Sequence, residues 1–182
     1  RGISARQRTV RDNRRLQLLN NPEGDGGSSG PYTRESETDD GRSGLLTFQP
    51  NPEVLSRYKT AGLNIPVVNQ VDPKTSANSF SSDMASAMVD HPYGKQVTIQ
   101  DPDNLLDAKL YRTEFGGGFA IKPDGDIIGV FQGANAPPKT SYAMIQLAVE
   151  QGGKKLDAFN TMLPRIYETL GFRPVSRVKW DD

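Results

Sequence analysis

Cysteine and histidine, two residue types that often carry catalysis or hold metals, are almost absent from this sequence. The chain has no cysteine, which excludes disulfides and thiolate chemistry. A single histidine, His91, excludes a histidine-rich metal site, and its place before Pro92 indicates a turn. Three aspartates, Asp101, Asp103 and Asp107, resemble a calcium loop only loosely, because the glycine and the terminal glutamate of the EF-hand pattern are missing. Acid–base chemistry would therefore fall to other carboxylates or to tyrosines.

The elements that would position such groups are clearest from residue 118 onward. Strand and helix patterns alternate over residues 118–123, 126–132, 140–153, 156–159, 161–170 and 173–180. The first two are joined by Pro123-Asp124-Gly125, whose turn chemistry predicts a tight hairpin. Thr140 or Ser141 is expected to cap the first helix. This alternation predicts an α/β layer with helices packed on a sheet.

The ordered set of segments resembles the C-terminal half of the GNAT superfamily of N-acetyltransferases. There a β-hairpin leads to a helix, a strand, a helix ending in Tyr-x-x-x-Gly-Phe and a closing strand; here the signature reads IYETLGFRPV, from Ile166 to Val175. The chain is also similar, in GFAIKPDGDIIGVF, LAVEQGGKKLDAF and LPRIYETLGFRPVSRV, to GNAT-like segments of large bacteriophage proteins. The resemblance covers roughly residues 96–182. It implies a GNAT-like α/β fold, with a mixed, mostly antiparallel sheet flanked by helices; the composition of the N-terminal segment adds an extended N-terminal arm to this fold class.

The resemblance also places a cofactor site at the start of the helix over 140–153. Members of the superfamily bind the pyrophosphate of acetyl-CoA there with backbone N–H groups, in a loop reading Arg/Gln-x-x-Gly-x-Gly/Ala. The stretch Gln132 to Ser141 does not match, and two prolines remove two amide donors. The residues left to contact a cofactor are Val130, Gly133, Lys139, Thr140 and Ser141. Lys139 is more simply interpreted as a solvated loop lysine.

The resemblance implies a catalytic role for Tyr167: it would be the acid that protonates the leaving thiolate. A phenol with a pKa near 10 can donate to a thiolate, although a tyrosine at this position also packs the helix onto the sheet. Glu114, Asp157 and His91 are candidate bases. Each is more simply interpreted as a surface, capping or turn residue.

Composition limits the partners and the organisation. The chain has 182 residues, with 22 Lys and Arg and 22 Asp and Glu, so its formal net charge is zero. No global attraction to nucleic acid or membranes follows, and no apolar run is long enough for a membrane span. Because the first residue is Arg1 rather than Met, we interpret the chain as a piece of a longer polypeptide. We expect a basic arm and flexible linker over residues 1–44. We expect a GNAT-like α/β domain over residues 45–182.

Six arginines lie within the first 15 residues, opposed only by Asp12. A short basic amphipathic helix is expected from about Ser4 to Asn20. Residues 21–44 are dense in Gly, Ser, Pro, Asp and Glu and lack the apolar content that offsets the entropy of ordering. The arginines either make weak contacts with nucleic acid or an acidic partner, or form a solvated arm.

The patterns over residues 45–107 indicate the first half of the folded domain. Strands are expected over 45–50, 65–71 and 97–99, and helices over 52–61 and 79–91. Phe80, Met84, Ala87 and Met88 lie at helical spacing, which is typical of a core stripe. Further residues expected in cores are Leu105, Leu106, Leu110, Phe119, Ile121, Ile127, Val130, Leu147, Leu156, Phe159, Ile166, Phe172 and Val175.

Two functions remain open. One is an acetyl-CoA-dependent N-acetyltransferase, which Tyr167 favours. The other is a catalytically silent GNAT-like module of a phage virion or injected protein, without a cofactor, which the loop prolines favour. Such a module would act by packing against other virion proteins or the rest of a longer polypeptide, and it is the function we expect. By resemblance the protein belongs to the virion; otherwise it is expected to be soluble in the host cytoplasm.

Overall fold

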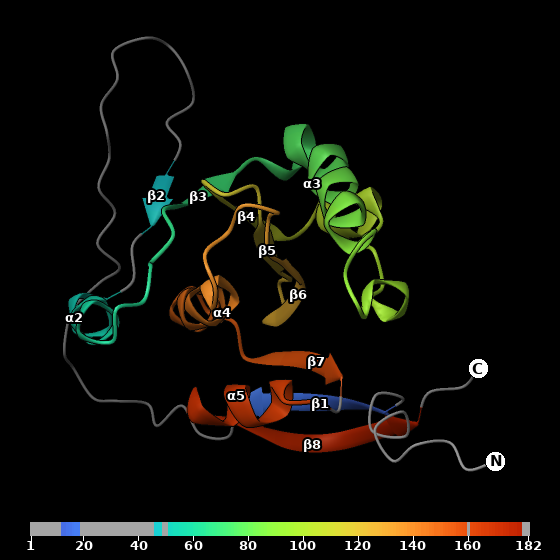
Figure 1. Ribbon diagram of the computed structural model, residues 1–182. Helices are drawn as coiled ribbons and strands as arrows, with labels where there is room; N and C mark the ends of the chain where they lie inside the picture. Colours follow the sequence, from blue (N-terminus) through green and yellow to red (C-terminus); the bar gives the residue numbers. More distant parts are fainter. Residues whose placement is uncertain (1–11, 19–45, 49–50, 160, 180–182) are drawn as a thin grey trace, which may run out of the picture. The chain divides into compact units, whose positions relative to one another are not determined.

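The computed structural model describes residues 12–18, 46–48, 51–159 and 161–179 (Figure 1). Two units make up the chain: a large unit, residues 28–153, and a small unit, residues 1–27 with 154–182. The boundary predicted between residues 44 and 45 lies outside the described residues. No helix in the described ranges is long and apolar enough to pass through a bilayer.

The large unit is built on a five-stranded antiparallel sheet in the order β2-β3-β4-β5-β6. Its strands are Leu46–Phe48 (β2), Val68–Val71 (β3), Lys109–Thr113 (β4), Gly118–Ile121 (β5) and Asp126–Phe131 (β6). The predicted β5–β6 hairpin is confirmed: Gly125 adopts a φ of 81° and its N–H donates to the Lys122 carbonyl at 2.9 Å. The predicted mixed α/β class, with a mostly antiparallel sheet flanked by helices, is confirmed as well.

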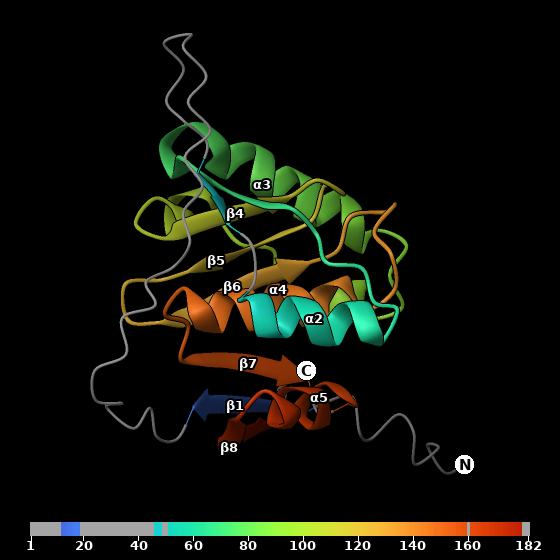
Figure 2. The same cartoon turned by 90° about the vertical axis from the view of Figure 1, so that its left-hand side faces the viewer.

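Helices cover both sides of this sheet. They are α2 (Pro52–Thr60), α3 (Pro73–Met88) and α4 (Thr140–Glu150), with short 3-10 turns η1 (Gly94–Gln96) and η2 (Pro102–Leu105). Figure 1 and Figure 2 show α3 on one side and α4, with α2 outside it, on the other. Asn51 and Asp72 fix the starts of α2 and α3, because each side chain accepts a hydrogen bond from a backbone N–H two residues on, at 2.8 and 2.9 Å.

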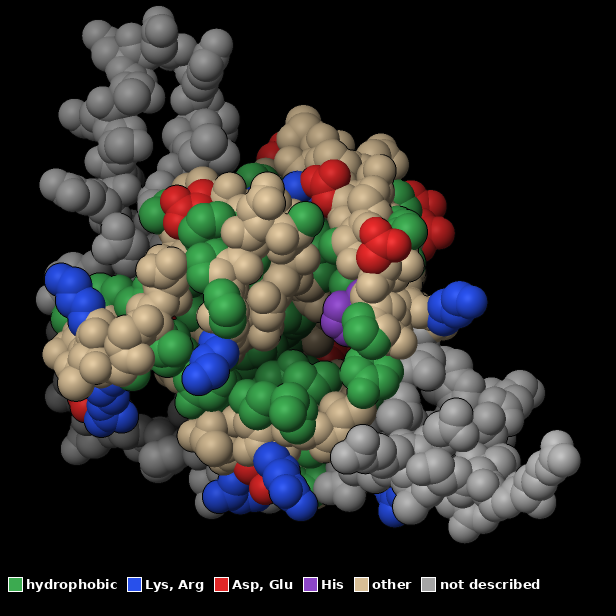
Figure 3. Space-filling model, in the orientation of Figure 1, with side chains coloured by type: hydrophobic (Ala, Val, Ile, Leu, Met, Phe, Trp, Pro, Cys, Tyr) green, Lys and Arg blue, Asp and Glu red, His purple; other side chains and the backbone are tan. Residues whose placement is uncertain are grey.

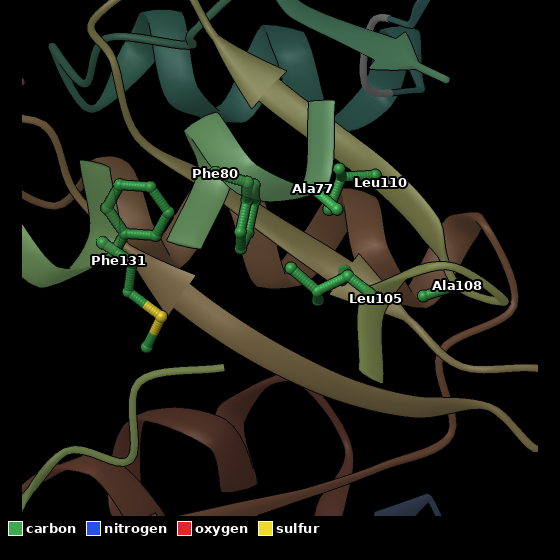
Figure 4. Close-up of a cluster of buried hydrophobic side chains, with 8 residues drawn as sticks. Ala77, Phe80, Leu105, Ala108, Leu110 and Phe131 are labelled. Atoms are coloured by element: carbon green, nitrogen blue, oxygen red, sulfur yellow. The ribbon is translucent and has the colours of Figure 1, made fainter. Parts of the chain in front are cut away.

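Phe80 of α3 is the centre of the core on the first side (Figure 4). Its ring is fully buried and meets the Phe131 ring edge-on, with centroids 5.2 Å apart. Gly129 adopts a φ of 59°, and a Cβ there would lie 3.1 Å from the Phe80 ring, so the glycine lets this ring approach the sheet. The predicted core stripe is confirmed: Met84 is buried, and Ala87 and Met88 pack against the same cluster.

The opposite side of the sheet carries Tyr111 and Phe119. These residues lie opposite each other on β4 and β5, and their rings stack with centroids 4.7 Å apart. Both are fully buried. The helix on this side, α4, contributes five buried apolar residues, Ala143, Met144, Ile145, Leu147 and Ala148. The sheet is therefore apolar on both faces, as expected for a layer between helices.

The small unit is a three-stranded antiparallel sheet with β1 in its centre. Its elements are β1 (Asp12–Leu18), β7 (Lys155–Phe159), α5 (Leu163–Thr169) and β8 (Phe172–Lys179). Leu16 of β1 is fully buried and lies opposite Leu156 of β7 and Pro174 of β8. The prediction of a helix from Ser4 to Asn20, within an extended arm, is therefore wrong over Asp12–Leu18, because these residues form a strand. The arginines before residue 12 lie outside the described residues.

Some local predictions also fail. Val97–Ile99 is not a strand; Val97 and Ile99 instead pack against the Phe80 cluster from an irregular segment. Leu106 and Val175 are 47% and 45% exposed, so neither belongs to a core. Val130, Phe159 and Ile166 are only half-buried. The other predicted core residues are buried, divided between the two units.

Candidate functional site

The segment from Gln132 to Ser141 joins β6 to α4 and contains most of the predicted cofactor residues. Lys139 precedes the helix with a φ of 66°, the only positive φ among the described non-glycine residues, and it makes no side-chain cap. Thr140 is fully buried, and its hydroxyl donates to the Pro137 carbonyl at 2.6 Å. The predicted cap by Thr140 or Ser141 is therefore wrong: the Thr140 hydroxyl bonds back into the loop, and no side chain caps the helix start.

Backbone donors at this helix start are largely engaged. Pro137 and Pro138 carry no N–H. The Thr140 N–H donates to the Pro137 carbonyl at 3.3 Å, and the Tyr142 N–H donates to the Lys139 carbonyl at 3.0 Å. An anion at a helix start needs several free N–H groups converging on it. The start of α4 therefore offers fewer free N–H groups than the start of an ordinary helix does.

Ser141 and Gly133 serve the local structure. The Ser141 Oγ accepts a hydrogen bond from Gln132 Nε2 at 2.7 Å, which ties the end of β6 to the first turn of α4. A Cβ on Gly133 would lie 1.7 Å from the Phe115 carbonyl oxygen, so its backbone packs directly on the β4–β5 turn. Val130 is half-buried within β6. The structure thus places Gly133 and Lys139 in the β6–α4 connection, Val130 in the strand before it, and Thr140 and Ser141 in the first turn of the helix after it.

The predicted acid, Tyr167, belongs to the other unit. It lies in α5, is 8% exposed, and its ring centroid is 6.3 Å from that of Phe172. Burial raises the pKa of the Tyr167 phenol to about 12. A phenol held in this way is a weaker acid than a free tyrosine, and its ring packs α5 onto β8.

The candidate bases have structural contacts of their own. Glu114 Oε1 accepts from the Val67 N–H at 3.3 Å while the Glu114 N–H donates to the Val67 carbonyl, so this residue joins two chain segments. His91 is exposed, and its Nδ1 accepts from the Tyr93 N–H at 3.2 Å. Asp157 is exposed on β7. Asp101 caps η2 through the Asp103 N–H, and no acidic or histidine cluster in the described ranges could hold a metal ion.

A polar cluster that the sequence did not reveal lies between α2 and α4. The Tyr58 and Tyr142 rings are 5.9 Å apart, and the Tyr58 hydroxyl is buried without a hydrogen-bond partner among the described residues. Desolvation raises the pKa of Tyr58, with smaller contributions from Tyr142 and Glu150. Desolvation also raises the pKa of the Glu150 carboxyl, opposed by hydrogen bonds from the Asn51 N–H, at 3.2 Å, and from Gln146.

The spacing of Tyr142, Gln146 and Glu150 was the available signal for this cluster, since residues four apart share one face of a helix. The partner Tyr58 could not be read in the same way, because nothing local places α2 beside α4.

A second missed arrangement involves Arg112 of β4. Its guanidinium forms an ion pair with Asp83 of α3 and lies over the Phe80 and Phe131 rings, 5.6 and 5.9 Å from their centroids. Nη1 of Arg112 is buried without a hydrogen-bond partner among the described residues. Because β4 itself was not predicted, this contact could not be foreseen. It closes the outer side of the Phe80 core.

Comparison with known proteins finds no protein-family model that matches the chain and no curated protein similar to it.

Proposed function

We propose that this chain is a GNAT-like module of a bacteriophage virion or injected protein that does not transfer acetyl groups and acts by packing against other proteins. The resemblance of its segments to GNAT-like phage sequences supports the family and the context. The observation that supports the loss of catalysis is the state of the N–H groups where α4 begins.

A pyrophosphate is held at a helix start by N–H groups that have no other partner. At α4 the two positions before Lys139 are prolines, and the N–H groups of Thr140 and Tyr142 bond to carbonyl groups of the same loop. Binding acetyl-CoA here would require these bonds to break. The exposed ammonium of Lys139 supplies charge but not the directed donors of a backbone.

The surroundings of Tyr167 support the same proposal. A general acid works best when its pKa lies near the working pH, and burial moves the Tyr167 pKa to about 12. The ring is in contact with Phe172, which makes packing its evident role. Action by protein contacts is compatible with the exposed apolar side chains, of which Val89 at 77% and Met162 at 68% are the most exposed.

One observation favours the alternative, an active N-acetyltransferase. Lys139 is held in the left-handed region, which costs a non-glycine residue roughly 1 kcal/mol. Strained residues concentrate at functional sites. If Lys139 binds the cofactor, the strain would serve to aim its side chain.

Calorimetric titration of the full chain with acetyl-CoA separates the two functions. We expect no saturable heat for the native chain or for the Lys139→Ala and Ser141→Ala variants. Saturable binding with a Kd of about micromolar strength, roughly −8 kcal/mol, and weakened in either variant would contradict the proposal. A Tyr167→Phe variant would then be assayed for loss of turnover.

A further inference from the structure

The small unit is assembled from two pieces of chain that lie far apart in the sequence. One piece is the segment 155–179, in which β7, α5 and β8 follow one another directly. The other piece is β1, which residues 19–154 separate from β7. Figure 2 shows β1 between β7 and β8, and its residues pair with both strands in antiparallel register. The continuous piece therefore takes its central strand from a remote part of the chain.

The continuous piece has contacts of its own, in which β1 takes no part. α5 packs against both β7 and β8. The ring centroids of Tyr167 and Phe172 are 6.3 Å apart, and both side chains are buried. Nη1 of Arg173 donates to the Glu168 carbonyl at 3.2 Å, which ties the start of β8 to the end of α5. Figure 3 shows apolar side chains gathered over β7 and α5. These contacts join β7 and β8 to one helix.

The space that β1 occupies between β7 and β8, called here the β7–β8 gap, is one strand wide. Neighbouring strands lie about 4.8 Å apart, so β7 and β8 are separated by roughly twice that distance. In the described residues each of them pairs with β1, and they do not pair with each other. Residues 13–17 face β7 and residues 12–18 face β8. Without a strand in the gap, the backbone groups on both inner edges would lose their partners, which is unfavourable.

The surroundings of Leu16 determine which strands fit this gap. The Leu16 side chain is fully buried, and the residue lies opposite Leu156 of β7 and Pro174 of β8. The pairing with β8 is irregular between Arg15 and Leu16, so a strand that fills the gap must match this irregularity as well. A second copy of the chain carries the same strand. It would make between chains every contact that β1 makes within one chain.

The length of the connection after β1 allows two copies to compete for the gap. Residues 19–45, which number 27, join β1 to β2. A chain of this length spans at most about 90 Å. A strand on such a tether meets its own β7 and β8 at an effective concentration of the order of 1 mM or below. When the protein itself approaches this concentration, β1 of a neighbouring copy competes with it, because the contacts are identical.

We propose that β1 exchanges between two copies of this chain, so that the β7–β8 gap of each copy receives Asp12–Leu18 of the other. Exchange of an identical element needs no new interface, which makes it a low-cost route to a dimer. In dilute solution each chain fills its own gap, and the exchanged pair forms where copies are concentrated. This inference does not depend on the proposed function or on whether the chain binds acetyl-CoA.

Introduced cysteines can report which chain fills the gap, because the sequence has none of its own. Arg15 lies opposite Ser176 of β8. Residues opposite each other in an antiparallel pair have Cα atoms about 4.5–5.5 Å apart, which is close enough for a disulfide. Arg15→Cys chains and ¹⁵N-labelled Ser176→Cys chains are mixed in denaturant, refolded together, oxidised and analysed by mass spectrometry. We expect disulfide-linked pairs with one chain of each kind, abundant at about 1 mM protein and at least tenfold rarer at about 10 μM.

Two controls and a second pair of variants accompany this test. Ser82→Cys, at an exposed site on α3 of the large unit, replaces Ser176→Cys in the matched control and should give mixed pairs only by random collision. The double variant Arg15→Cys/Ser176→Cys should close its disulfide within one chain in dilute solution. Gln17→Cys with Lys155→Cys examines the β7 side in the same way. Circular dichroism checks folding, and this second pair carries the test if the first does not fold.

The proposal fails if mixed pairs at about 1 mM are no more abundant than in the Ser82 control, since β1 would then fill only the gap of its own chain. A yield that stays the same on dilution would also overturn it, because exchange between copies depends on concentration. If the double variant forms no disulfide within one chain, β1 does not occupy the gap in this register and the proposal fails with it.

Discussion

Leu16 of β1 lies directly opposite Leu156 of β7, and both side chains are buried. This pairing joins residues far apart in the chain, and β8 flanks β1 on its other side. The small unit therefore depends on the N-terminal strand, because β7 and β8 lie on opposite sides of β1. A fragment that begins at residue 45 would lack the central strand of this unit.

Leu16→Ala should destabilise the small unit by about 2–5 kcal/mol, the range for truncating a buried leucine. Denaturant unfolding measures the loss of stability, and hydrogen exchange of the β7 and β8 amides reports it for the small unit. Leu106→Ala is the matched control, since Leu106 is 47% exposed and should lose much less. A loss below about 1 kcal/mol for Leu16→Ala would mean that β1 is not the centre of the sheet.

Two phenylalanines near each other in sequence should respond differently to truncation. Phe172 is fully buried against Tyr167, whereas Phe159 is half-buried. Phe172→Ala should therefore lose about 3–5 kcal/mol, and Phe159→Ala clearly less. Chemical denaturation of the two variants is the measurement. Equal losses would show that Phe159 is enclosed in solution.

The sequence carried most of the information for the large unit because its signals are local. The β5–β6 hairpin follows from Pro123-Asp124-Gly125, and α2 follows from Pro52 at its start and Gly62, with a φ of 65°, after its end. The start of α3 at Pro73 was missed, although Asp72 supplies a cap there, because the first turns of this helix are polar.

β1 could not be found in the same way. β1 owes its conformation to strands whose paired residues lie 138 to 167 residues further along the chain, from Gln17↔Lys155 to Asp12↔Lys179, and such pairings leave little local pattern. The alternation of Leu16 and Leu18 was the only hint of a strand. Of the candidate site, the sequence located the β6–α4 connection, but not the hydrogen bonds from Thr140 and Tyr142 that occupy its donors.

Glu150 should make the large unit less stable as pH rises. Desolvation raises the pKa of its folded-state carboxyl above the unfolded value of 4.5, so the folded state holds the proton more tightly. The favourable contribution is present below the unfolded pKa and is lost as pH rises through the folded pKa. Glu150→Gln mimics the protonated form and should raise Tm at neutral pH, with the difference vanishing below about pH 4. A variant less stable than the native chain at neutral pH would mean that the hydrogen bond from the Asn51 N–H outweighs desolvation.

β8 has the features that protect a sheet edge from pairing with other chains. Among the described residues it pairs only with β1, and it carries the exposed Pro174, exposed arginines and an irregularity in register at Val175. Pro174→Thr should restore a backbone donor and increase self-association. Sedimentation velocity over a range of concentrations measures this, with Pro92→Thr in an exposed turn as control. A monomeric Pro174→Thr variant at all concentrations would show that the proline is not what protects the edge.

Lys139 adopts a backbone conformation, with a φ of 66°, that glycine tolerates better than lysine does. A lysine in the left-handed region is strained by its Cβ, and glycine relieves that strain. Lys139→Gly should therefore stabilise the large unit or leave it unchanged, within about 1 kcal/mol, even though the helix start loses a side chain. Lys139→Val should destabilise it, because a branched Cβ fits this conformation poorly. Thermal unfolding of these two variants and of Lys139→Ala should give the order of stability expected from backbone strain: Gly most stable, then Ala, then Val. If both the glycine and the alanine variants are less stable than the native chain, the ammonium has a stabilising partner, and the case for a bound anion at this helix start becomes stronger.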